Sequence, residues 1–266
     1  MTQVGFVGAG RMGAPMVRRL VDAGHEVRAL GRSVEKRRAV SELGAQPVTD
    51  LADIGADADV VIVCVFTDEQ VQQICLESVL LTTMRSGTSL VIHTTGSPRT
   101  AEAIAAEAAA QGVDVVDAPV SGGPHDIAAG QVTLFVGGAD DTVDRVRPVL
   151  ASYGDPILHV GPIGAGQGVK LINNTLFAAQ IGLLHEAVRL GDRLGIEEPR
   201  LLDAIGHGSA ASRVASIVGA RGSVDAFIEM VGEFVGKDVA VVRKTAAELG
   251  SELGLLDDVI NAGFRG

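Results

Sequence analysis

The sequence predicts an α/β protein in two parts, a mainly parallel sheet covered by helices over residues 1–161 and an all-helical domain over residues 162–266. In the first part, short runs rich in Val, Ile and Phe alternate with segments of helical spacing. Strands that alternate with helices form parallel sheets buried on both faces. After Gly161 the strand-like runs stop and helical periodicity takes over.

The expected strands and helices of the first part follow from this alternation. The strands are expected at Val4–Val7, Glu26–Leu30, Val60–Val65, Ser89–His93, Asp114–Asp117 and Val132–Gly137. The helices between them are expected at Met12–Ala23, Val34–Leu43, Asp68–Leu80 and Pro98–Gln111.

The second part opens with a long helix, predicted over Gly168–Leu194, whose apolar residues form a wide stripe. Shorter helices are expected at Pro199–Ile205, Ser212–Val218, Val224–Val235 and Lys237–Leu249. Because the long helix carries apolar residues on more than one side, we expect subunits to pair through it, in a homodimer or homotetramer.

Composition excludes several classes of protein. The chain is 47% hydrophobic and 21% charged, which argues against disorder, and its net charge of -11 disfavours a nucleic-acid partner. Its apolar runs are too short for a membrane span. Two cysteines and six scattered histidines give neither a disulfide framework nor metal-ligand spacing, so we expect no metal. Without an evident leader segment, a cytoplasmic location is expected.

A glycine-rich turn follows the first expected strand and opens a helix. In this context Gly8 permits a tight turn, Gly10 lets a pyrophosphate approach the backbone, and Gly13 allows close helix packing. The helix N-terminus adds amide donors for the phosphates. The turn therefore predicts a Rossmann domain that binds a dinucleotide. The residues expected at the cofactor are Gly8, Ala9, Gly10, Arg11, Met12 and Gly13.

The end of the second expected strand bears on the choice between NADP and NAD. NAD sites usually place an acid there to bind the ribose 2'-hydroxyl, whereas this chain has Arg32 and Ser33, which could bind a 2'-phosphate. We therefore predict NADP as the preferred cofactor, with NAD as the alternative. In that alternative Arg32 is a solvated loop residue and Glu35 or another acid binds the ribose.

Polar residues gather at the start of the long helix. Lys170, Asn173 and Asn174 are spaced i, i+3 and i+4, so they project from one side. A lysine that acts as a general base near neutral pH needs its charged form destabilised, by burial, by the helix N-terminus or by a cation such as Lys237. The competing interpretation is a surface lysine whose ammonium group reaches water.

Four motifs in order resemble the β-hydroxyacid dehydrogenase family, especially its 3-hydroxyisobutyrate dehydrogenase branch. They are the segments Gly5–Met16, Asp117–Pro124, Gly164–Asn174 and Lys237–Val239. The resemblance covers nearly the whole chain and implies a hydride transfer between nicotinamide and a small hydroxy acid, or the matching semialdehyde or keto acid.

The resemblance also implies roles for single residues. Ser121, with the Gly122 and Gly123 amides, would bind the substrate carboxylate, although these residues alone would also fit a plain turn. Lys170 would be the proton donor and acceptor, and Asn174 would orient the substrate. The residues further expected beside the cofactor are Val65, Thr95 and Lys237; Gly96, next to Thr95, departs from the usual pattern.

Three alternatives remain. Imine reductases share this architecture but usually replace the lysine by Asp or Tyr, and 6-phosphogluconate dehydrogenase has a larger helical domain and a histidine before the asparagine, where this chain has Asn173. A non-catalytic NADP-binding protein is the third. The chain also departs from the family in two places. We expect its C-terminal tail to be shorter than in many members. It also has a histidine at position 93, which we interpret as a structural residue whose hydrogen bonds are satisfied.

Overall fold

The computed structural model describes residues 1–264, so Arg265 and Gly266, the last two residues of the expected helical domain, lie outside the described residues. The chain divides into two compact units, Met1–Lys170 and Leu171–Gly266. The sequence places the boundary at Gly161, whereas in the structure the first unit also holds the first turn of the long helix.

Within the described residues, nine strands of the first unit form one sheet. They are β1 (Gln3–Val7), β2 (Glu26–Leu30), β3 (Gln46–Val48), β4 (Val60–Val63), β5 (Ser89–Ile92), β6 (Asp114–Asp117), β7 (Val120–Ser121), β8 (Val132–Gly137) and β9 (Gly154–Gly161). Their order is β3-β2-β1-β4-β5-β6-β8-β7, with β9 paired to β8. The six strands from β3 to β6 are parallel, in the Rossmann order, and β8 runs antiparallel to β6. The predicted fold class is confirmed.

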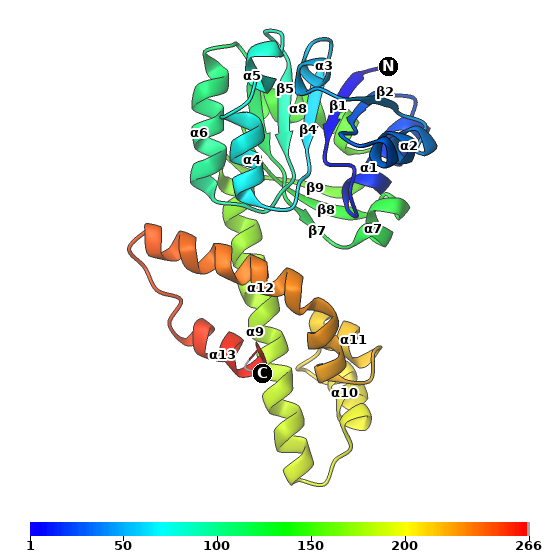
Figure 1. Ribbon diagram of the computed structural model, residues 1–266. Coiled ribbons are helices and arrows are strands. Elements are labelled where there is room, and N and C mark those ends of the chain that lie inside the picture. The colour runs from blue at the N-terminus through cyan, green and yellow to red at the C-terminus, as the bar shows by residue number, and fades with distance from the viewer. Residues whose placement is uncertain (265–266) are drawn as a thin grey trace. The chain divides into compact units, whose positions relative to one another are not determined.

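Helices cover both faces of this sheet (Figure 1). They are α1 (Gly13–Asp22), α2 (Val34–Glu42), α3 (Leu51–Gly55), α4 (Asp68–Cys75), α5 (Leu80–Thr83), α6 (Pro98–Ala109), α7 (Pro124–Ala129) and α8 (Asp140–Leu150). Side chains of β4 alternate between two cores: Val60 and Ile62 pack with α1, α2, α7 and α8, while Val61 and Val63 pack with α3 to α6.

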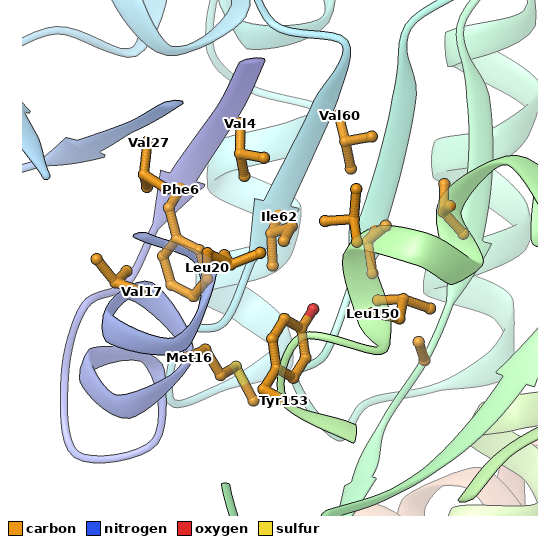
Figure 2. Packing of buried hydrophobic residues seen from close by; sticks show 14 of the residues in the cluster. Val4, Phe6, Met16, Val17, Leu20, Val27, Val60, Ile62, Leu150 and Tyr153 are labelled. Atoms are coloured by element: carbon orange, nitrogen blue, oxygen red, sulfur yellow. The ribbon is translucent and has the colours of Figure 1, made fainter. Parts of the chain in front are cut away.

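The first of these cores includes the only tyrosine of the chain. Figure 2 shows Phe6, Met16 and Leu20 close to Tyr153, which follows α8 and is fully buried. Its hydroxyl lies 2.8 Å from Nε2 of His93, at the end of β5. The other ring nitrogen of His93 lies 2.6 Å from the Ala118 carbonyl oxygen, which can only accept, so Nδ1 carries the proton and Nε2 accepts from Tyr153. His93 is thus a satisfied structural histidine, as predicted.

Several predicted boundaries are wrong in detail. The helix expected over 68–80 is interrupted, because the Ser78 hydroxyl bonds the Ile74 carbonyl and the Leu80 amide and so turns the chain between α4 and α5. The strands β3, β7 and β9 were not predicted, since their short or polar sequences lack a clear apolar alternation.

The second unit is helical within the described residues. It contains most of α9 (Ala165–Arg193), together with α10 (Glu198–His207), α11 (Arg213–Gly219), α12 (Val224–Glu248) and α13 (Leu255–Phe264). Ile181 and Leu184 of α9 pack with Phe227 of α12 and with α10 and α11. The two helices expected at 224–235 and 237–249 are one, because a glycine weakens a helix by only about 1 kcal/mol and Gly236 sits inside α12 without a crowding neighbour.

Two glycines let α9 and α13 touch at their backbones. A Cβ on Gly182 would lie 2.0 Å from the Val259 carbonyl oxygen, and one on Gly263 would lie 2.8 Å from the Gly182 Cα. Neither position admits a larger residue without moving a helix.

Two kinds of feature are absent from residues 1–264. No helix within residues 1–264 is long and apolar enough to cross a membrane. The same residues contain no cluster of three or more His, Cys, Asp or Glu suited to a metal ion.

Candidate functional site

The turn between β1 and α1 is shaped by its three glycines. Gly8 has φ +102°, and a Cβ there would lie 2.1 Å from the Cys64 carbonyl oxygen, while a Cβ on Gly13 would lie 2.1 Å from the Gly8 carbonyl oxygen. A Cβ on Gly10 would meet nothing within 4 Å. The protein itself therefore requires glycine at positions 8 and 13, whereas at position 10 the space is open.

This open space fits a dinucleotide. Helix α1 begins beside it with neither an acidic residue in its first turn nor a side-chain cap, so its positive end is not neutralised by its own residues. Arg11 and Gly10 are exposed, while Ala9 and Met12 pack against the first core. The backbone at Gly10 and the N-terminus of α1 are thus suited to a pyrophosphate.

The end of β2 carries the residues expected to distinguish NADP from NAD. Arg32 and Ser33 are both exposed. The Ser33 oxygen caps α2 by accepting from the Lys36 amide at 3.2 Å, and its hydrogen bond to Glu35 lowers the pKa of that exposed carboxyl group. A cation and an acid therefore both stand beside this strand end.

The ends of β4 and β5 are joined by a threonine that sequence reasoning missed. The Thr94 hydroxyl accepts from the Val65 amide at 2.9 Å and donates to the Val65 carbonyl at 3.0 Å. Thr94 is buried, while the predicted residue Thr95 is more accessible. A Cβ at Gly96 would lie 1.9 Å from the Asp68 carboxylate, which explains why this chain has glycine there.

Asp117, at the end of β6, holds the start of α9. Its carboxylate, fully buried, accepts from the Gly164 amide at 2.7 Å and the Gln167 amide at 2.6 Å. Burial raises the pKa of Asp117 to about 6, and the backbone donors of Gly164, Gln167 and Gly166 oppose that rise. The start of α9 and the residue before it are thereby fixed to the carboxyl end of β6.

Lys170 is the last residue of the first unit and is 8% exposed. It lies one turn beyond the residues held by Asp117. This burial agrees with the interpretation of Lys170 as a buried lysine. It does not fit the competing interpretation, a surface lysine whose ammonium group reaches water.

In the second unit, Asn174 belongs to a cluster of polar side chains. Its side-chain nitrogen donates to the Asp238 carboxylate of α12 at 2.6 Å, and its oxygen accepts from Asn173 at 3.2 Å. Lys237 pairs with the same Asp238 carboxylate at 3.2 Å. Asp238 therefore joins α12 to α9, and it also orients the Asn174 amide.

The expected substrate loop contains an unexpected acid. Ser121 ends β7 and Gly122 has φ +138°, so the loop turns as a glycine-rich segment can. The Gly123 amide, expected to face a substrate carboxylate, instead donates to the Asp126 carboxylate at 2.6 Å. Asp126 also lies 3.3 Å from the His125 ring. Within the structure, the Gly123 amide is thus occupied by a side chain of the protein.

Comparison with known proteins agrees with this geometry. Residues 3–161 match the family model of the NAD binding domain of 6-phosphogluconate dehydrogenase. Residues 164–261 match that described as the NAD-binding domain of NADP-dependent 3-hydroxyisobutyrate dehydrogenase.

Curated relatives and a solved structure span most of the chain. A probable 3-hydroxyisobutyrate dehydrogenase of Mycobacterium bovis is 37% identical over 205 residues, 77% of this chain and 69% of the relative. The 2-(hydroxymethyl)glutarate dehydrogenase of Eubacterium barkeri is 32% identical over 235 residues, 88% of this chain and 76% of the relative. The structure of Mycobacterium tuberculosis 3-hydroxyisobutyrate dehydrogenase with L-serine is similar with a TM-score of 0.88 and 29% identity, covering 100% of this chain and 93% of that one.

A Rossmann unit with an open glycine turn, joined to a helical unit and matched by these relatives, defines a nicotinamide-dependent oxidoreductase that acts on hydroxy acids. The chain belongs to the β-hydroxyacid dehydrogenase family, in its 3-hydroxyisobutyrate dehydrogenase-like branch. The family and enzyme class expected from the four motifs are confirmed.

Proposed function

We propose that Lys170 transfers the proton in this oxidoreductase reaction. Bound nicotinamide supplies the hydride acceptor or donor. In oxidation the Lys170 amine would take the proton of the substrate hydroxyl, and in reduction its ammonium would return that proton to the carbonyl oxygen. The observation that carries the proposal is the burial of Lys170 directly after a helix start that is bonded to the ends of β5 and β6.

The other expected residues complete this proposed site. Asn174 would orient the substrate hydroxyl, and Ser121 with the Gly122 amide would bind its carboxylate. The Gly123 amide could join them where the Asp126 carboxylate moves aside. Lys237 would contact the cofactor. The substrate class is a small hydroxy acid or its semialdehyde or keto acid.

Replacement of Lys170 tests the proposal. The Lys170→Ala variant should bind NADPH as the wild type does and lose most turnover, about 100-fold or more. Lys244→Ala, at an exposed position of α12, is the matched control. The panel should hold 3-hydroxyisobutyrate, tartronate semialdehyde, glyoxylate, succinic semialdehyde, L-serine and 2-(hydroxymethyl)glutarate, each with both cofactors. Near-full turnover by Lys170→Ala would remove Lys170 from the mechanism.

NADP is the cofactor that we propose is preferred. Arg32 is exposed at the end of β2, and Lys36 and Arg37 follow in the first turns of α2, so positive charge surrounds the place expected for a 2'-phosphate. The Glu35 carboxylate opposes this preference. Binding titrations should give a lower Kd for NADPH than for NADH, and Arg32→Ala should remove most of the difference. A wild type that binds NADH more tightly would contradict the proposal.

A homodimer or homotetramer is the proposed assembly. Ile172, Leu176, Leu183, Leu190 and Leu194 are 46% to 66% exposed. Their separations of four and seven residues place them along one side of α9 and its end. A continuous exposed apolar stripe of this kind is typical of a subunit interface. Sedimentation should show an oligomer, and Leu183→Asp should shift it toward monomer; a concentration-independent wild-type monomer would rule the assembly out.

A cytoplasmic location is also proposed. The two free cysteines are in keeping with it, because disulfides are rare in the cytoplasm.

A further inference from the structure

Gln167, in the first turn of α9, is buried with both ends of its side chain bonded. It is 2% exposed, its Oε1 accepts from the Gly96 amide at 2.9 Å, and its Nε2 donates to the Thr94 carbonyl at 2.8 Å. A carbonyl can only accept and an amide N–H can only donate, so the two ends of Gln167 cannot be exchanged. The side chain therefore holds the segment 94–96 in one orientation.

The backbone of Gln167 is fixed as firmly as its side chain. The Asp117 carboxylate accepts from the Gln167 amide at 2.6 Å. A Cβ at Gly137 would lie 2.4 Å from an oxygen of the Asp117 carboxylate, and a Cβ at Gly166 would lie 2.7 Å from one. Both positions beside this carboxylate therefore require glycine. Gln167 cannot shift along the helix without breaking these bonds.

Gln167 thus connects two parts of the proposed site within the first unit, Lys170 and the Thr94–Gly96 segment. Lys170 is three residues further on, on the same side of α9 as Gln167. Thr94, bonded to Gln167, also bonds Val65, and Thr95 is the residue expected beside the nicotinamide. Resting on the proposed function, we infer that Gln167 is a positioning residue, which fixes Lys170 relative to the Thr94–Gly96 segment through its two side-chain hydrogen bonds.

The hydrogen bonds of the Gln167 side chain allow a positioning role to be distinguished from a role in packing alone. A methionine would occupy a similar volume with no directional bond, and it would leave the Gly96 amide and the Thr94 carbonyl unsatisfied. A small error in the placement of reacting groups can cost about 100-fold in rate without unfolding the protein. The rate should therefore depend on the two bonds more than stability does.

Charged groups lie on the elements that adjoin Gln167 and its partners. Asp117 of β6 accepts from the Gln167 amide, and Asp68 of α4 accepts from the Ser97 amide, next to Gly96. A Cβ at Gly164 would lie 3.2 Å from an oxygen of Glu102 of α6, and Lys170 is on α9 itself. Three of the four are acids. A new carboxyl group at position 167 would therefore favour its protonated form, because both burial and nearby negative charge raise the pKa of an acid.

The experiment compares Gln167→Met, Gln167→Glu and the control Gln73→Met, at an exposed position of α4. We expect Gln167→Met to lower kcat about 10- to 100-fold, with KM and NADPH affinity changed about twofold or less. Gln167→Glu should be impaired at high pH. Its kcat relative to wild type should recover as pH falls, because a protonated carboxyl group can again donate to Thr94 and accept from Gly96. Hydrogen exchange at Gly96 should accelerate in Gln167→Met and stay unchanged in the control.

The possible results separate this inference from the proposed function. Unchanged kcat in Gln167→Met, or a pH-independent activity ratio for Gln167→Glu, would show that Gln167 is only structural and would overturn the inference. If the wild type turns over no compound of the panel, the proposed function fails. In that case hydrogen exchange alone tests whether Gln167 fixes the Thr94–Gly96 segment. Faster exchange at Gly96 in Gln167→Met supports this role, and unchanged exchange overturns it.

Discussion

The carboxylate of Asp126 accepts a hydrogen bond from the backbone amide of Gly123, 2.6 Å away, in the loop where the family resemblance expects a substrate carboxylate. The second carboxylate oxygen faces His125 at 3.3 Å. A resident negative charge at this amide competes with an anionic ligand and repels it. The loop is consequently less favourable to a carboxylate than its glycines alone indicate.

Removal of the Asp126 charge should improve the use of carboxylate substrates. Asp126→Asn keeps an oxygen for the Gly123 amide, so the turn should persist while the repulsion disappears. We expect kcat/KM for a hydroxy acid to rise about tenfold, equivalent to about 1.4 kcal/mol, relative to that for its uncharged methyl ester. Steady-state kinetics on the acid and ester measure this ratio, with Asp192→Asn as an exposed control. An unchanged ratio would show that Asp126 does not oppose the substrate carboxylate.

Gly10→Ala should separate cofactor binding from folding. A Cβ at position 10 meets no protein atom within 4 Å, so the variant should fold and melt within about 2 °C of the wild type. The added methyl group would occupy the space expected for the pyrophosphate, so Kd for NADPH should rise about tenfold or more. Gly13→Ala, whose Cβ would strike the Gly8 carbonyl, should instead lose stability. Calorimetric titration and thermal melting distinguish the two effects; normal NADPH binding by Gly10→Ala would contradict the placement.

Asp117 should make the first unit more stable at acid pH. The pKa of Asp117 is raised to about 6 from 3.8, so between these values the folded state binds more protons than the unfolded state. Its contribution to the free energy of unfolding is present below pH about 4 and declines by about 3 kcal/mol as pH rises through 6. Asp117→Asn should lose this dependence. Urea unfolding at a series of pH values measures the difference between the two proteins, and a difference that does not vary with pH would refute it.

His93 should act in the opposite direction. Burial lowers the pKa of His93 to about 4 from 6.5, despite its bond to the Ala118 carbonyl, so the unfolded state binds the extra proton between these values. Stability should therefore rise by about 3 kcal/mol as pH increases from 4 to 6.5. The wild type should gain this much over His93→Gln across that interval. His93 and Asp117 change the free energy of unfolding in opposite directions over the same pH range, so only single variants can reveal either effect. If the free energies of unfolding of the wild type and His93→Gln vary with pH in parallel, the prediction for His93 is wrong.

The parts of the site that the sequence predicts correctly depend on local order along the chain. The glycines of the first turn lie within six residues, so their spacing is visible in the sequence, although part of the need for glycine at position 8 comes from the distant Cys64 carbonyl. Lys170 and Asn174 are likewise neighbours on one helix. The strand and helix alternation that predicts the Rossmann unit is local in the same sense.

The parts that the sequence does not predict depend on contacts between distant residues. Asp117 and Gln167 are 50 residues apart, and Gln167 and Gly96 are 71 apart, so neither pairing leaves a periodic pattern. One signal in the sequence could have predicted part of this. An acid at the end of the buried strand Asp114–Asp117 requires hydrogen-bond donors, because an unpaired buried carboxylate is costly. The opposite error occurs at Gly236, where the local preference for a break was overridden by packing of α12 on α9.

The burial of Tyr153 makes the protein carry its own optical reporter. Since the chain has one tyrosine and no tryptophan, its intrinsic ultraviolet emission originates from a single phenol, enclosed beneath the nucleotide-binding sheet and bonded to His93. Loss of structure in the helical unit alone would leave that signal almost unaltered, whereas far-ultraviolet dichroism would register it at once. Recording both therefore tells which half of the molecule melts first without attaching any label.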